Sequence, residues 1–358
     1  MFCENRYSLL IVICFEFFLF HSSEEICGQP YYKPYLPTSR HLSSRIANGV
    51  EARKHSHPWQ ALIHRQFDDH IGVCGGSLIH WKESNASDLI LTAAHCVLNG
   101  DPSEHATPWK TITSAFSSVF NGHKSELITN VSHVEVYLGV HNTEQFDSKV
   151  KRFLVSAMGV GSFNENDKKH DIAVLKLENK ATYNEFIQGV CLPTQDENLP
   201  DAPRYCMVAG WGLLADNKET TKLQQVKAYI YEDAVHQSTF HKSRMICTDS
   251  SIRKAGAREG DSGSPLTCAK NGTFYIYGIM SFQFREPYCF TVDKEAFVKV
   301  AHYVKWLKKV VTKLHEKKND SQPLVNGQTM EPERTGNLKM PQSSNSLSRK
   351  NSSLSFLQ

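Results

Sequence analysis

Three stretches of the chain carry side chains that could work together as a nucleophile, a base and an acid. Residues 260–266 read Gly-Asp-Ser-Gly-Ser-Pro-Leu and place Ser262 between glycines, which permit tight turns that other residues disfavour. His95 follows small residues and precedes a cysteine, and Asp171 opens a strongly apolar run. A buried aspartate needs a hydrogen-bonding partner, and an imidazole N–H is one. Each stretch alone also fits a polar loop or a structural histidine, but together they indicate nucleophilic attack on an acyl group.

The elements that must position these residues are mostly short strands. Brief runs rich in β-branched and aromatic residues alternate with Gly, Pro, Asn and Asp, which is typical of a β-barrel or sandwich. We expect strands at 59–63, 74–79, 89–92, 134–138, 172–177, 205–209, 223–226 and 274–280. One helix is predicted from Phe297 to Leu314, where apolar residues recur at intervals of three and four.

Composition and cysteine content indicate an exported protein rather than a nucleic-acid binder. The 358 residues carry 40 Lys+Arg against 37 Asp+Glu, a net charge of +3, which lacks the concentrated basic character of nucleic-acid-binding chains. Of ten cysteines, two fall in the apolar N-terminal run, and eight, an even number, remain for disulfides. That run is short and ends in polar residues, so we interpret residues 1–23 as a signal peptide, with an uncleaved anchor as the alternative.

The remaining segments outside the strand-rich region differ in composition. Residues 24–45 look like an extended linker that ends at Arg45, directly before the apolar Ile46. Residues 99–130 form a long polar segment, which predicts a lid or exosite, or else a tolerated surface insertion. Residues 315–358 are rich in Ser, Asn, Lys and Gln, and we predict a disordered tail with no membrane span. Glycosylation motifs begin at Asn85, Asn130, Asn271, Asn319 and Asn351.

Taken in order, the motifs resemble those of the chymotrypsin/trypsin-like serine endopeptidase family. The resemblance covers about residues 27–313 and rests on several independent stretches. These are Arg45 to Gly49, Cys74 to Ile79, Leu91 to Cys96, Asp171 to Leu177, Gly210 to Gly212, Gly260 to Leu266 and the final helix. It implies an all-β fold of two six-stranded antiparallel β-barrels with a C-terminal α-helix, in a peptidase domain spanning 46–314.

The resemblance also implies a role for each candidate residue. Ser262 would attack the peptide carbonyl, His95 would move the proton, and Asp171 would orient the imidazole. The N–H groups of Gly260 and Ser262 would form the oxyanion hole. Residues 24–45 would then be a propeptide. Cleavage of the bond between Arg45 and Ile46 would release an amine that pairs with Asp261, so the intact chain is expected to be a zymogen.

Disulfides are assigned by the same resemblance. Cys74 is expected to pair with Cys96, Cys206 with Cys268, and Cys27 with Cys191. The usual partners of Cys247 and Cys289 are missing, so these two either pair with each other or stay free.

The expected substrate pocket departs from the trypsin pattern. Gly256 stands where trypsin-like members carry an aspartate, and Gln283 replaces a glycine at the pocket mouth. Ser281 is expected to keep a hydrogen bond to Asp171. Glu295 falls on the expected back wall of the pocket and could receive Lys or Arg side chains, although Arg258 could neutralise it or Glu295 could lie on the surface instead.

The function expected from the sequence is therefore that of a secreted, extracellular serine endopeptidase. Its partners would be protein or peptide substrates, an activating protease and protein inhibitors, with no nucleic acid. We expect no cofactor and no metal, because Val140 and His141 stand where the family's calcium ligands would begin. The alternative is a pseudoprotease that uses the fold for binding only.

Overall fold

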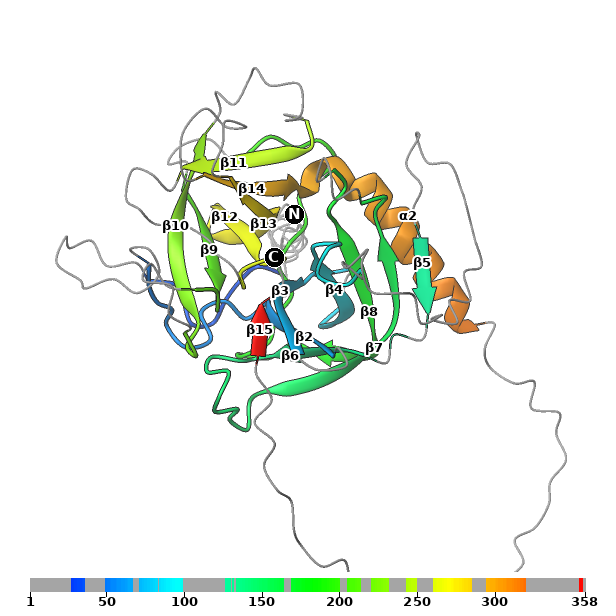
Figure 1. Ribbon diagram of the computed structural model, residues 1–358, viewed down its shortest axis with the longest axis horizontal. Helices are drawn as coiled ribbons and strands as arrows, with labels where there is room; N and C mark the ends of the chain where they lie inside the picture. Colours follow the sequence, from blue (N-terminus) through cyan, green and yellow to red (C-terminus); the bar gives the residue numbers. More distant parts are fainter. Residues whose placement is uncertain are drawn as a thin grey trace, which may run out of the picture.

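A computed structural model provides the structure of the chain. It describes residues 27–35, 49–66, 71–82, 84–98, 126–129, 131, 133–163, 169–199, 205–213, 220–231, 243–249, 260–284, 294–319 and 354–356. Its two sheets lie side by side, and a helix runs along one flank (Figure 1).

The first sheet closes into a six-stranded barrel. Its strands are β2 (Gln60–Gln66), β3 (Ile71–Leu78), β4 (Ala86–Thr92), β6 (Val134–Leu138), β7 (Lys151–Val160) and β8 (Ala173–Thr182). The order is β3-β2-β6-β7-β8-β4, and β4 pairs back with β3 to complete the ring. All of these pairings are antiparallel. Two short strands attach to it: β5 (Glu126–Thr129) pairs with β7, and β15 (Leu354–Phe356) runs parallel to β3.

The second sheet closes in the same way. Its strands are β9 (Tyr205–Gly210), β10 (Gln224–Tyr231), β11 (Met245–Asp249), β12 (Pro265–Lys270), β13 (Thr273–Phe284) and β14 (Lys294–Lys299). The order is β10-β11-β14-β13-β12-β9, and β9 pairs with β10. The short β1 (Val50–Glu51) adds to β10. The predicted fold class, two six-stranded antiparallel barrels with a C-terminal helix, is confirmed.

The helix α2 (Val300–Asn319) binds the barrels through the apolar stripe read from the sequence. The seven residues of that stripe are all buried: Val300, Tyr303, Val304, Leu307, Val310, Val311 and Leu314. All but Val304 join the main hydrophobic core. The helix packs on β7 and β8 of the first barrel and also contacts β13. No helix in the described part of the chain is long and apolar enough to cross a membrane.

Element boundaries differ from the sequence expectation at the C-terminal end. The predicted helix began at Phe297, but this residue lies in β14 and pairs with both β11 and β13. The helix also continues to Asn319, so the predicted boundary of the disordered tail at residue 315 is too early. Within that tail, residues 354–356 form a strand. The strand β5 lies in the segment expected to be a loop, of which 99–125 and 130 lie outside the described residues.

Candidate active site

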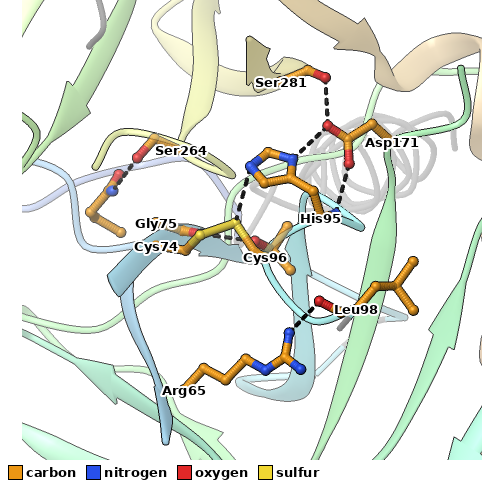
Figure 2. Close-up of a disulfide and its surroundings, with 11 residues drawn as sticks. Arg65, Cys74, Gly75, His95, Cys96, Leu98, Asp171, Ser264 and Ser281 are labelled. Atoms are coloured by element: carbon orange, nitrogen blue, oxygen red, sulfur yellow. Dashed lines mark hydrogen bonds and ion pairs between the residues drawn. A yellow bond between two sulfur atoms is a disulfide. The ribbon is translucent and has the colours of Figure 1, made fainter. Parts of the chain in front are cut away.

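Asp171 is the centre of a hydrogen-bond network that joins the two barrels. Its Oδ1 accepts the backbone N–H of His95 at 2.9 Å, and its Oδ2 accepts the His95 Nδ1 at 2.8 Å. The Ser281 hydroxyl donates to the same Oδ2 at 2.5 Å. Since Ser281 lies on β13 of the second barrel, the network crosses the boundary between barrels, and it contains the Ser281 bond expected from the sequence. Figure 2 shows the imidazole between the carboxylate and the Cys74–Cys96 disulfide.

The position of Asp171 follows from the structure on either side of it. Gly161 N donates to Ile172 O, which ties the Asp171 turn to the end of β7. His170, directly before the aspartate, has a positive φ of 58° and its Nδ1 lies 3.0 Å from the hydroxyl of Tyr303. Because Tyr303 is on α2, the helix supports the turn that carries Asp171. No local sequence pattern indicates this role for Tyr303, since only the fold brings the helix to the turn.

The network fixes which nitrogen of His95 carries the proton. Asp171 is fully buried, and burial alone would raise its pKa, but the contacts from His95 and Ser281 hold that pKa below its ordinary value. An ionised carboxylate only accepts hydrogen bonds, so Nδ1 of His95 must be the donor. In the neutral imidazole, Nε2 is then unprotonated and basic. This is the tautomer that a general base requires.

Ser262 lies in a turn held against β3 of the first barrel. Its carbonyl accepts the N–H of Gly75 at 2.7 Å, and Gly75 follows Cys74, which is bonded to Cys96 next to His95. The serine and the histidine are therefore tied to adjacent residues of one strand. Ser262 is 7% exposed. Within the described part of the chain, its hydroxyl makes no hydrogen bond to the imidazole.

The glycine after Ser262 is required by the geometry of the turn. Gly263 has a φ of 79°, and a Cβ there would lie 2.3 Å from Thr92 Oγ1 and 2.4 Å from Gly75 O. No side chain fits without moving the backbone. Two of the turn's amides are used within the fold, because Gly263 N donates to Met280 O and Ser264 N donates to Asp261 O.

The other two amides are those predicted for the oxyanion hole. Among the hydrogen bonds of the described residues, neither Gly260 N nor Ser262 N donates to a protein acceptor. Amides near a nucleophile that are not used within the fold can donate to an oxyanion.

Asp261 is buried behind the nucleophile. Its Oδ1 accepts the N–H of Gly212 at 2.8 Å, and a Cβ at Gly212 would lie 2.5 Å from the carboxylate. Asp261 has at least one further interaction besides this hydrogen bond. Arg45 and Ile46, the expected processing site, lie outside the described residues, as do Gly256 and Arg258 of the expected pocket.

The disulfides follow the pairings implied by the resemblance. Cys27 bonds Cys191, Cys74 bonds Cys96, and Cys206 bonds Cys268. Cys247 is disulfide-bonded too, so it is not free. Cys289 lies outside the described residues. Cys74, His95 and Cys96 cluster closely enough to suggest a metal site, but both sulfurs are in the disulfide and offer no thiolate ligand.

The pocket residues are described only in part. Glu295 is on β14, is 3% exposed, and its Oε2 accepts the hydroxyl of Thr248 at 2.5 Å. It pairs across the sheet with Thr248 on one side and Gln283 on the other. The alternative of an exposed surface position for Glu295 is thus wrong. Thr248 is a partner that the sequence did not reveal, because strand register alone brings it there.

Two of the glycosylation motifs, at Asn85 and Asn271, lie at the surface. Asn85 is exposed just before β4, and Asn271 is exposed in the turn between β12 and β13. Asn130 lies outside the described residues.

Comparison with known proteins identifies the relatives of this chain. The trypsin family model matches residues 46–307. The chain is 29% identical over 295 residues to the mouse hepatocyte growth factor activator serine protease, covering 78% of this chain and 38% of that protein. It is 27% identical over 279 residues to mouse granzyme B(G,H), covering 76% and 94%. The chain thus spans about two fifths of the first relative and nearly all of the second.

A solved structure titled "Structure of GrC" has the same fold. It superposes with a TM-score of 0.55 at 24% identity, covering 74% of this chain and 98% of that one.

Proposed function

Because this chain belongs to the trypsin family, we propose that it is a serine endopeptidase that hydrolyses peptide bonds through Ser262, His95 and Asp171. The observation that carries the proposal is the buried Asp171 network, which holds the His95 imidazole with its proton on Nδ1. A basic Nε2 is what a neighbouring serine hydroxyl needs in order to become a nucleophile.

The reaction would proceed in two halves. Ser262 Oγ attacks the carbonyl carbon while His95 Nε2 takes the hydroxyl proton, and Asp171 stabilises the imidazolium that results. The amides of Gly260 and Ser262 donate to the oxyanion, where one such donor is worth about 3–4 kcal/mol. His95 then protonates the leaving amine, and water hydrolyses the acyl-enzyme by the same route.

We further propose that the protein is exported and made as a zymogen. Cleavage after Arg45 frees the amine of Ile46, which pairs with the buried Asp261 and shapes the turn that carries Ser262. The Cys27–Cys191 disulfide keeps the segment before Arg45 attached after cleavage. Three disulfides, a further disulfide-bonded cysteine at Cys247, and exposed glycosylation motifs at Asn85 and Asn271 support an extracellular location. Its partners would be protein or peptide substrates, the activating protease and protein inhibitors.

The test compares the chain before and after a single cut. The residues before Ile46 are replaced by the recognition sequence of a site-specific protease, and hydrolysis of a peptide library is measured with and without that protease. We expect hydrolysis only after cleavage and none in the Ser262→Ala variant. Equal rates before and after the cut would overturn the zymogen proposal. A cut protein no more active than Ser262→Ala would favour the pseudoprotease alternative.

Substrate preference is a separate proposal that rests on Glu295. The Glu295 side chain is 3% exposed, and its Oε2 accepts the Thr248 hydroxyl. On the expected pocket wall its carboxyl oxygens could accept hydrogen bonds from a substrate Lys or Arg, whose side chains only donate. We expect cleavage after Lys and Arg as well as after large apolar residues. Glu295→Gln should lower the Lys/Phe cleavage ratio, and Thr248→Val, which keeps the Glu295 carboxyl group, should lower it less. An unchanged ratio in Glu295→Gln would contradict the role.

A further inference from the structure

The strand β3 has one edge that is shared by three different segments. Its first edge bonds β2 along the whole length, from Gln60↔Ser77 to Gln66↔Ile71. On its second edge, β4 pairs only with Ser77 and Leu78. Gly75 N on that edge binds Ser262 O. The remaining stretch, Ile71 to Val73, pairs with β15.

The backbone groups of β3 that make these contacts all point to the same edge of the strand. Backbone groups of a strand point to alternate edges with a period of two residues. Gly75 N points away from β2 because it binds the Ser262 carbonyl, so the N–H groups of Val73 and Ile71 point the same way. In the row of Val73, Gly75 and Ser77, the partners are β15, the nucleophile turn and β4.

The strand β15 therefore ends close to the nucleophile. Phe356 is the Cα partner of Val73, two residues before Gly75, and two strand residues span about 7 Å. The pairing is parallel, so β15 advances along β3 in the direction of Gly75. Figure 1 shows β15 in red beside β3.

We propose that residues 354–356 are a built-in strand that occupies the open edge of β3 and restricts the approach of peptides to Ser262. The docking of the segment stands by itself, and its effect on hydrolysis rests on the proposed endopeptidase activity. Substrate peptides that extend along this edge compete with the chain's own C-terminal segment.

Several physical features favour this occupant over an unrelated partner. An unpaired strand edge is a ready template for another extended segment, and such strand addition uses main-chain hydrogen bonds. The sequence Leu354-Ser355-Phe356 alternates apolar and polar residues, as half-buried strands do. A segment in the same chain as its binding edge has an effective concentration on the order of mM. A three-residue strand of modest affinity can therefore remain docked.

A synthetic peptide tests the docking without any need for catalysis. The probe is a fluorescent peptide with the sequence of residues 348–358, and the proteins are the full chain and a variant that ends at Ser353. We expect the peptide to bind the shortened protein and to bind the full chain at least about tenfold more weakly, because the edge is already occupied. Equal binding to both proteins, or binding to neither, would overturn the proposal.

A proline control shows whether the peptide binds as a strand. The triple change Leu354→Pro, Ser355→Pro and Phe356→Pro removes every N–H that the segment could donate to β3. This peptide should bind the shortened protein at least about tenfold more weakly, the loss expected for one or two ladder hydrogen bonds. Unchanged binding would contradict strand pairing.

Hydrogen exchange gives a second measurement at a single residue. The Val73 amide faces β15, whereas the neighbouring Gly72 amide faces β2 and serves as an internal control. Removal of residues 354–358 should accelerate exchange at Val73 and leave Gly72 unchanged. Equal exchange at Val73 in the two proteins would show that β15 is not docked.

The effect on access is measured with the forms cut after Arg45. The variant that ends at Ser353 should hydrolyse long peptides with a several-fold higher kcat/KM than the full chain, mainly through a lower KM. If β15 docks but the two forms hydrolyse peptides equally, the restriction of access is wrong. If neither form hydrolyses any peptide, the endopeptidase proposal fails, while peptide binding and exchange still decide the docking.

Discussion

Two buried aspartates of the first barrel, Asp171 and Asp88, have similar neighbours and different roles. Each accepts hydrogen bonds from a histidine and from another side chain: Asp171 from His95 and Ser281, and Asp88 from His315 and Lys176. The first pair of partners lies where the two barrels meet. The second joins β4, β8 and the last turns of α2.

The difference lies in whether a partner carries a permanent charge. Lys176 is a buried cation that contacts Asp88 directly, so the carboxylate is already neutralised whatever the state of His315. Burial alone would raise the pKa of Asp88, but Lys176 and His315 hold it below its usual value. Asp171 has only dipoles and one imidazole as donors. A proton gained by His95 therefore meets an otherwise unneutralised carboxylate, which suits His95 to act as a base. The Asp88 cluster instead stabilises the contact between β4, β8 and α2.

The largest expected effect comes from the Asp171→Asn variant. The amide cannot hold His95 with its proton on Nδ1, so kcat of the cut enzyme should fall by about 10⁴. Peptide hydrolysis is measured under saturating substrate, and thermal unfolding confirms that the variant is folded. Asp88→Asn is the matched control, since it makes the same change in the other cluster and should leave kcat of the folded enzyme unchanged. A similar loss of kcat in both variants would remove the distinction between the clusters.

The Asp88→Asn variant should show its effect on stability instead. It leaves the Lys176 ammonium buried without its anion, and breaking a buried pair in this way typically costs about 3–5 kcal/mol. Denaturant unfolding at neutral pH, compared with the parent chain, measures the loss. Removal of both charges in Asp88→Asn with Lys176→Met should recover much of it. If the single variant is as stable as the parent, the Asp88 cluster does not stabilise the fold.

The hydrogen-bond cluster around Asp171 could be predicted from the sequence because each of its members lies in a recognisable local pattern. His95, Asp171, Ser262 and Ser281 were placed by short motifs, and the structure joins three of them through the Asp171 carboxylate. The position of the Ser262 hydroxyl relative to His95 depends on the turn around it, and no local pattern determines that distance.

The Asp88 cluster could not be predicted, because strand register and a helix end create it. Lys176 sits in an apolar run that gave no sign of a buried cation. Leu89 pairs with Lys176, and an irregularity between Ser87 and Leu89 turns Asp88 toward it, as β-bulges commonly re-aim side chains.

Strand pairing that local sequence patterns do not show also explains why the predicted helix start at Phe297 is wrong. Residues 297–299 fit a helical stripe, but pairing of β14 with strands on both sides overrides that local preference.

The pH dependence of stability should distinguish Asp88 from its amide. Because its pKa is lower in the folded chain than in the unfolded one, Asp88 stabilises fully above the unfolded value of about 3.9. That contribution is lost as the pH falls through the lower folded pKa. The gap in unfolding free energy between parent and Asp88→Asn should thus be complete near pH 7 and shrink below about pH 4. A gap that stays constant down to the lowest pH would contradict an ionised Asp88.

Ser281→Ala should weaken the Asp171 cluster without removing its contacts to His95. Asp171 would keep both donors from His95 and lose one hydrogen bond to a charged group, which is worth about 1.5–3 kcal/mol. If that loss falls on the transition state, kcat drops by about 10- to 100-fold. Ser281→Thr keeps the hydroxyl and should retain more activity. A kcat equal to that of the parent would show that the bond between barrels does not support His95.

The smallest effect is expected for His315→Ala at the edge of the Asp88 cluster. The side chain is 35% exposed and its Nε2 lies 3.3 Å from Asp88 Oδ1, so solvent screens the contact and Lys176 already balances the carboxylate. Unfolding free energy should fall by about 1 kcal/mol, against at most about 0.5 kcal/mol for Lys308→Ala on the exposed face of α2. A double-mutant cycle with Asp88→Asn isolates the pair itself. A coupling energy of zero would show that the contact between His315 and Asp88 adds nothing to the packing of α2. A coupling as large as that between Asp88 and Lys176 would show that Lys176 is not the main partner that stabilises the Asp88 carboxylate.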